Sequence, residues 1–293
     1  MLFRSDISNE APQFFFISKK GKIHYRQLFV ENGDPAKKVC ILPGFTMSSS
    51  LYLMIASELN KNGYEVVIAD YWGRGFSEFP SDDDFSLGSY VDEVIMLLKH
   101  LNFEKCNLIG FSYGGVVAAG IALKKENIVD KLLLVSPLFF QKNEPSPLQK
   151  FTLGTSLIGP FILKMTASNS VPNQIEQQFC FPSRCDNIVK GATQICMKQY
   201  KKSWDGCSAI SKSIADYDAN EILQTAIDLK DINKKMMIIF GEQDCLIEVK
   251  NAKAWWGKWI PSVKINIIED GGHLVFLENM NDTLFLLLDF LKN

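Results

Sequence analysis

Uninterrupted apolar runs alternate with amphipathic segments through the first half of the chain. The apolar runs predict strands that are buried on both faces, and they occupy residues 37–45, 65–71, 106–111 and 131–137. The amphipathic segments predict helices at residues 50–62, 86–101 and 114–124. A hairpin is expected ahead of them, with strands at residues 14–18 and 23–30. Buried strands separated by helices predict an α/β fold with a mostly parallel central sheet flanked by helices.

This alternation stops in the middle of the chain. Residues 138–230 contain helix-like segments broken by Ser, Asn and Pro, without a clear strand pattern. Strand-like apolar runs return at residues 236–244 and 263–270, and each is followed by a helical segment. We therefore expect one α/β core formed by residues 1–137 and 231–293, interrupted by a helical insertion at residues 138–230.

Composition and charge argue against a nucleic-acid-binding protein and against a membrane-spanning one. The chain has 293 residues, and 31 Lys and Arg against 33 Asp and Glu leave a formal net charge of −2. A protein that binds nucleic acid through its backbone charge needs a basic face, so a nucleic-acid partner is not expected. There is no run of roughly 18 apolar residues that would predict a transmembrane helix, and no signal-peptide pattern at the N-terminus. The expected location is cytoplasmic.

The seven cysteines do not form a metal-binding pattern. No CxxC pair occurs and no His lies near the cluster between Cys180 and Cys207, so a zinc site is not expected. Cys40 and Cys106 fall in predicted buried strands, where cysteine behaves as a small apolar residue. We expect reduced, structural thiols.

The pentapeptide Gly110-Phe111-Ser112-Tyr113-Gly114 has the pattern G-x-S-x-G. It follows a predicted buried strand and precedes a helix rich in small residues. A sharp strand-to-helix turn exposes the central Ser hydroxyl, and only glycine-sized neighbours let the two elements pass so closely. This context favours Ser112 as a nucleophile over a structural turn.

A serine nucleophile needs a base, and the chain has three histidines. His24 falls in the hairpin, where we expect an edge or surface position, and His100 lies near a helix end, where we expect exposure to solvent or a capping role. His273 directly follows a predicted strand and two glycines, which makes it the candidate base.

The base in turn needs a carboxylate that fixes its tautomer. Asp244 ends a predicted strand and turn and is the expected partner of His273. Glu242 lies too close to the strand end, and Asp270 is better explained as a turn residue. The order Ser112, Asp244, His273 is the order found in α/β-hydrolases.

With these motifs in place, the chain resembles an α/β-hydrolase-fold serine hydrolase with a helical cap, of the esterase and monoacylglycerol-lipase type. The segment Asp70–Ser77 resembles the family's D-x-x-G-x-G-x-S loop, and His273–Asn279 resembles its H-x-x-x-x-E-x segment. The resemblance covers nearly the whole chain, with the insertion matching the cap.

The resemblance implies an oxyanion hole built from two backbone N–H groups. In this sequence they belong to Tyr113, which follows the nucleophile, and to Phe45 in the loop after the third strand. Many relatives have His-Gly where this chain has Pro43-Gly44. The family's glycine-rich loop is mainly structural, so Asp70 and Arg74 are assigned no catalytic role.

The implied reaction is acyl transfer to water, with no metal or organic cofactor. A small-molecule carboxylic ester with a lipophilic part is the first expectation for the substrate. Thioester hydrolysis and carbon–carbon bond hydrolysis use the same triad and stay open, as does a slow-turnover ligand receptor of the same fold. The sequence leaves the natural substrate and the oligomeric state undetermined.

The start of the insertion is unusually apolar. Residues 138–167 hold only four charged side chains. Three explanations stay open for this surface: packing on the core or within the cap, a lid over an apolar pocket, or a peripheral contact with a membrane surface.

Overall fold

The computed structural model describes residues 11–31, 34, 37–202 and 204–293. Its centre is an eight-stranded sheet with the order β1-β2-β4-β3-β5-β6-β7-β8. The strands are β1 (Gln13–Ile17), β2 (Lys22–Leu28), β3 (Lys38–Leu42), β4 (Glu65–Ala69), β5 (Cys106–Phe111), β6 (Val129–Val135), β7 (Lys235–Gly241) and β8 (Lys264–Ile268). β1 and β2 pair antiparallel, β2 also runs antiparallel to β4, and the remaining pairs are parallel. The expected α/β fold and the hairpin are confirmed.

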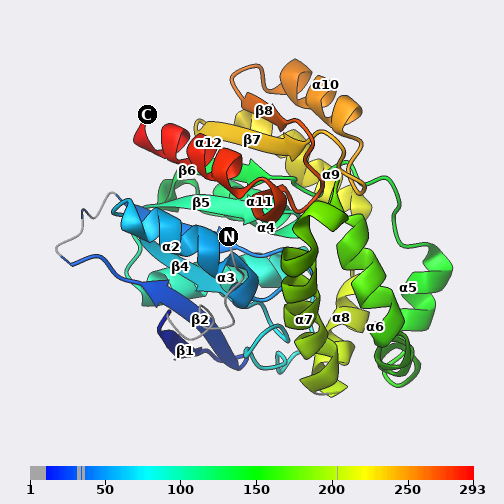
Figure 1. Cartoon of the computed structure of the whole chain (residues 1–293). Helices are drawn as coiled ribbons and strands as arrows, with labels where there is room; N and C mark the ends of the chain where they lie inside the picture. Colours follow the sequence, from blue (N-terminus) through cyan, green and yellow to red (C-terminus); the bar gives the residue numbers. More distant parts are fainter. Residues whose placement is uncertain (1–10, 32–33, 35–36, 203) are drawn as a thin grey trace.

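Helices pack on both faces of the sheet, as the strand pattern predicted (Figure 1). Alternate residues of β3 enter separate cores, because successive side chains of a strand point to opposite faces. The core on one face includes residues of α3, α4, α9 and α10, and the core on the other includes residues of α2 and α12. These helices are α2 (Leu53–Lys61), α3 (Leu87–His100), α4 (Tyr113–Lys124), α9 (Ala219–Asp228), α10 (Val249–Trp259) and α12 (Met280–Lys292), and the short α11 (Val275–Glu278) precedes α12.

The register of the parallel strands aligns their carboxyl ends. Leu42 of β3 pairs with Gly110 of β5, Phe111 of β5 with Val135 of β6, and Gly241 of β7 with Ile268 of β8. Loops that follow these strands therefore begin at one edge of the sheet, which is where ligands bind in open α/β sheets.

The chain between β6 and β7 is mostly helical in its described residues. It contains α5 (Pro147–Gly154), α6 (Ile158–Gln177), α7 (Asp186–Lys202), α8 (Trp204–Ala215) and α9, with short 3₁₀ turns between some of them. Helices α5 to α8 pack on one another, whereas α9 packs against α4 of the core. We propose that residues 138–230 form the cap of a core built from residues 1–137 and 231–293. The packing of α9 shows that the last helix of this segment also contributes to the core layer.

The prediction that His24 lies at the surface is wrong. His24 is fully buried, and its Nδ1 lies 2.6 Å from a carboxylate oxygen of Asp70. The pair anchors β2 to the loop that follows β4, and Phe15 and Phe76 pack on the imidazole ring. A strand pattern does not reveal such a partner, because Asp70 lies 46 residues further along the chain.

Two other local predictions agree with the structure. His100 is exposed at the last residue of α3, where it stacks on Phe16. Cys40 and Cys106 are buried free thiols in β3 and β5. Within the described residues, no helix combines the length and apolar character needed to cross a lipid bilayer.

Candidate active site

Ser112 occupies a sharp turn between β5 and α4. Its backbone has φ of 53° and ψ of −120°, a conformation that is strained for any residue with a Cβ. A Cβ at Gly110 would overlap the backbone of Gly114, and one at Gly114 would overlap the carbonyl oxygen of Leu42. Gly110 therefore lets α4 pass close to β5, and Gly114 lets α4 begin close to the end of β3, which is the structural context predicted for the motif.

Three side chains from three loops meet at the carboxyl edge of the sheet. Nε2 of His273 lies 2.9 Å from Oγ of Ser112, and Nδ1 of the same ring lies 2.8 Å from a carboxylate oxygen of Asp244. Ser112 follows β5, Asp244 follows β7 and His273 follows β8. The structure thus brings together the three residues selected from sequence, in the arrangement of a nucleophile, a base and an orienting carboxylate.

Asp244 is held as a carboxylate in spite of its burial. It is 2% exposed, and burial alone would raise its pKa. Attraction to His273, the hydrogen bond to the ring, and N–H donors from Leu246 and Ile247 outweigh that effect, so the pKa lies below its ordinary value. An ionised Asp244 accepts a hydrogen bond from a protonated Nδ1 of His273. In that tautomer Nε2 is unprotonated and can take the proton of Ser112.

The two rival carboxylates lie outside this arrangement. Glu242 and Asp270 are both exposed to solvent. Asp270 has a φ of 54°, which agrees with its interpretation as a turn residue. The choice of Asp244 over these two rests on direct geometry.

The loop after β3 runs beside the nucleophile. A Cβ built on Gly44 would lie 3.5 Å from that of Ser112, and Tyr52 accepts the Gly44 N–H through its hydroxyl at 2.8 Å. The ring of Phe45 contacts the ring of Tyr113 edge to face, with centroids 5.1 Å apart. Tyr113 is the first residue of α4, so its backbone N–H has no acceptor within the helix. The two amides proposed for the oxyanion hole therefore belong to residues that contact each other beside Ser112.

Arg74 makes contacts near the site that the sequence analysis did not predict. Its Nε donates to the carbonyl oxygen of Phe45 at 2.9 Å, and its Nη2 donates to Oγ of Ser213 on α8 at 2.9 Å. The guanidinium is 1% exposed and also packs against the Phe45 ring. Arg74 thus fixes the peptide that follows Phe45 and links this loop to the inserted helices. The partner Ser213 is 139 residues away in the chain, so no local motif could have indicated the contact.

Replacing Arg74 with Gln is expected to lower kcat about tenfold with little change in KM. The loss of one oxyanion donor typically costs about 10²–10³ in kcat, and an indirect loosening of the donor loop should cost less. Ester hydrolysis and the affinity for an alkyl boronic acid, a transition-state analogue, would be measured together. Ser213→Ala keeps the bond from Nε to Phe45 and should have a smaller effect. A Gln variant that raises KM alone would contradict a role in positioning the oxyanion loop.

Glu278 fixes the loop that carries His273. Its two carboxylate oxygens accept the backbone N–H groups of Gly272 at 2.9 Å, Cys180 at 2.9 Å and Phe181 at 2.7 Å. Cys180 and Phe181 lie between α6 and α7, so this carboxylate joins the His273 loop to the insertion. The Glu of the H-x-x-x-x-E segment therefore holds the backbone beside the base in place.

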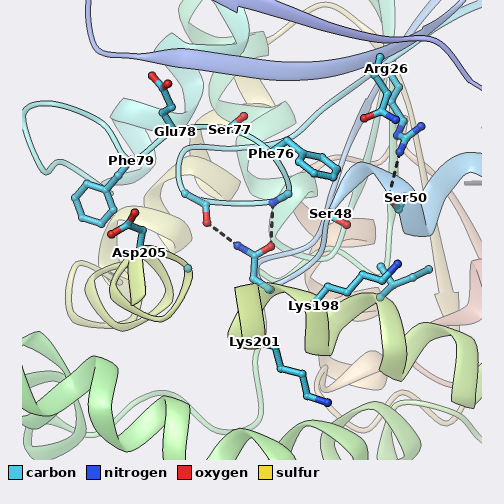
Figure 2. Close-up of a pocket in the computed structure, with 16 residues that line it drawn as sticks. Arg26, Ser48, Ser50, Phe76, Ser77, Glu78, Phe79, Lys198, Lys201 and Asp205 are labelled. Carbon is cyan, nitrogen blue, oxygen red and sulfur yellow. Dashed lines mark hydrogen bonds between the residues drawn. The ribbon is translucent and has the colours of Figure 1, made fainter. Parts of the chain in front are cut away.

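A cavity of about 630 Å³ lies between the loop 73–79 and helices α7 and α8 (Figure 2). Gln199 of α7 also lines it, and its side chain donates to the carbonyl oxygen of Gly73 at 2.6 Å and accepts the N–H of Gly75 at 2.9 Å. Charged side chains such as Lys198 and Asp205 line this cavity, and none of the three triad residues does. It is therefore a space separate from the triad, and its lining mixes charged side chains with apolar ones such as Phe76, Phe79 and Ile195.

Together, the doubly covered parallel sheet, the strained serine turn and the Ser-His-Asp arrangement define a class of protein, the α/β-hydrolases. A family model described as alpha/beta hydrolase fold matches residues 37–280. The chain belongs to this family.

Several relatives of the chain are named as hydrolytic enzymes. The chain is 26% identical over 281 residues to the monoacylglycerol lipase ABHD6 of Mus musculus. This alignment covers 92% of the present chain and 80% of the relative. Among solved structures, the enol-lactonase from Burkholderia xenovorans LB400 superposes with a TM-score of 0.76 at 16% identity, covering 96% of this chain and all of the other. The 2-hydroxy-6-oxo-6-phenylhexa-2,4-dienoate hydrolase from Rhodococcus sp. strain RHA1 superposes with a TM-score of 0.75 at 19% identity, covering 97% and 99% of the two chains. The identification of the chain as a hydrolase with lipase- and esterase-like relatives is confirmed.

Proposed function

We propose that the chain is a serine esterase that cleaves a carboxylic ester with a lipophilic part. The observation that carries this proposal is the continuous hydrogen-bonded series from Ser112 through His273 to Asp244 at 2.9 and 2.8 Å. A serine hydroxyl is a weak nucleophile by itself, and this series supplies both the base and the group that orients it.

In the proposed acylation step, Nε2 of His273 takes the proton of Ser112 while Oγ attacks the ester carbonyl carbon. Negative charge then develops on the carbonyl oxygen, and the backbone N–H groups of Phe45 and Tyr113 donate hydrogen bonds to it. The tetrahedral intermediate collapses, its carbon–oxygen bond to the alcohol breaks, and His273 gives its proton to the leaving alkoxide. An acyl-Ser112 ester remains.

The deacylation step repeats this chemistry with water. His273 takes a proton from a water molecule, whose oxygen attacks the acyl carbon, and the same two amides stabilise the second oxyanion. The bond to Ser112 breaks, Oγ recovers the proton from His273, and the carboxylic acid leaves. Asp244 keeps its charge throughout and stabilises the imidazolium that forms twice in each cycle.

The carboxylic ester is favoured over thioester or carbon–carbon substrates by the relatives of known name. Two mammalian monoacylglycerol lipases align with 92% of this chain. The dienoate hydrolase is similar in structure at 19% identity, a level that supports the shared fold and not a shared substrate. A slow-turnover ligand receptor is the alternative of another class, and the contact of nucleophile, base and carboxylate argues against a decayed site.

The efficiency of hydrolysis is expected to rise with acyl length along a series of p-nitrophenyl esters. Each additional buried CH₂ contributes about 0.8 kcal/mol, or roughly a fourfold increase in kcat/KM, until the acyl site is full. The measurement compares acetate, butyrate, hexanoate and octanoate, with Ser112→Ala as the background. Failure to hydrolyse any member above that background would contradict the esterase proposal. A steady fall from acetate onward would contradict only the lipophilic acyl part.

A further inference from the structure

The start of the insertion presents an apolar surface to solvent. Six large apolar side chains of α5, α6 and the turn between them are between 55% and 76% exposed: Leu148, Phe151, Leu157, Ile158, Phe161 and Met165. We call these six residues the α5–α6 patch. They fall within eighteen consecutive positions, whereas most monomeric proteins scatter such residues singly.

Helix α5 makes this patch unusual. None of its eight residues is buried, although the helix packs beside α6 and α8. A short helix gains most of its stability in proteins from burying one face, and α5 leaves Leu148 and Phe151 outside. It lies at the outer edge of the molecule, away from the sheet (Figure 1). The apolar residues of the insertion therefore do not all pack on the core, and those of the patch are available for an external partner.

The charges around the patch select the kind of partner. Residues 145–175 contain Lys150 and Lys164 and no acidic residue. Nζ of Lys150 donates to the carbonyl oxygen of Tyr217, which leaves Lys164 as the exposed lysine of this segment. Asp216, which follows α8, is itself exposed and accepts the backbone N–H of Phe85. An apolar helical face bordered by lysine fits the interface of a membrane with anionic headgroups. A second copy docked through the same patch would bring Lys164 towards its own equivalent, and residues 145–175 contain no acidic residue to pair with it.

We propose that the α5–α6 patch docks this protein peripherally on an anionic lipid surface. The six apolar side chains enter the region between headgroups and acyl chains, and Lys164 at the border of the patch pairs with the headgroups. Docking concerns a surface outside the catalytic machinery, so it does not depend on the esterase proposal.

Vesicle flotation tests the proposal with the full chain. The vesicles are phosphatidylcholine alone or phosphatidylcholine with phosphatidylglycerol, and the variants are Phe151→Gln/Phe161→Gln, Lys164→Gln and the control Phe285→Gln. Phe285 on α12 is 70% exposed, which matches the exposure of Phe151, but it lies outside the patch. Circular dichroism and the melting temperature check that each variant is folded.

The wild type is expected to float with the anionic vesicles and to bind phosphatidylcholine more weakly. The Phe151/Phe161 variant should lose at least tenfold in partitioning, while Phe285→Gln binds as the wild type does. Lys164→Gln should weaken binding to the anionic vesicles about fivefold. Wild-type protein that floats with neither vesicle overturns the proposal, as does an equal loss in Phe285→Gln. A wild-type dimer that becomes monomeric in the Phe151/Phe161 variant would assign the patch to a second copy instead.

Discussion

Ser112→Ala is expected to reduce ester hydrolysis by about 10³-fold or more while the protein stays folded. The variant removes the atom that forms the acyl-enzyme, and triad members act as a unit, so His273→Ala should be about as damaging. The Ser112 hydroxyl contacts His273 at the edge of the sheet and fills no core space. The melting temperature should therefore change little.

Ser136 provides a matched control for this experiment. It follows the neighbouring strand β6, and its φ of 45° is also in the left-handed region. Ser136→Ala changes the same atoms at the same edge of the sheet and should retain most of the activity. A fluorophosphonate probe should label the wild type and Ser136→Ala but not Ser112→Ala. Rapid labelling or turnover that survives in Ser112→Ala would refute the assignment of the nucleophile.

Asp244→Asn is expected to lower kcat about 10⁴-fold, because the amide imposes the wrong tautomer on His273. The carboxylate accepts N–H donors from Leu246 and Ile247 on one oxygen and contacts Nδ1 of the ring with the other. In Asn the second position becomes an NH₂ donor, so Nδ1 must give up its proton and Nε2 must carry it. Nε2 then cannot take a proton from Ser112.

The rival carboxylates serve as controls for the Asp244 prediction. Asp270→Asn and Glu242→Gln change exposed side chains at the same edge of the sheet and should stay within a few-fold of the wild-type kcat. Single-turnover measurements with p-nitrophenyl butyrate would separate acylation from product release. A severe loss in Glu242→Gln with a mild one in Asp244→Asn would show that Glu242, and not Asp244, is the orienting acid.

The α5–α6 patch also narrows the explanations for the apolar start of the insertion. The sequence left three explanations open for the apolar start of the insertion, and packing on the core was one of them. The exposure of Phe151 and Phe161 excludes that explanation for these two side chains. A lid over an apolar pocket stays a prediction for other residues of the insertion, since neither the cavity beside α7 and α8 nor the one beside α6 and α7 is lined by a triad residue.

The sequence by itself determined the elements and the candidate chemistry of this protein. Strand runs and helical periodicity are local patterns, and the G-x-S-x-G turn has a partly local cause, since a Cβ on Gly110 would overlap the first turn of α4. His273 and Asp244 could be chosen because each follows a strand of a parallel sheet, and the carboxyl ends of such strands share one edge.

Only the tertiary structure decided the contacts between distant segments. The pairing of His24 with Asp70 joins two elements that both look ordinary in sequence, which is why a surface position was wrongly expected. The bonds of Arg74 to the oxyanion loop and to Ser213 likewise depend on how the insertion packs on the core. Burial and hydrogen bonding between such segments arise from the packing of whole layers, and the order of residues along one segment carries no record of it.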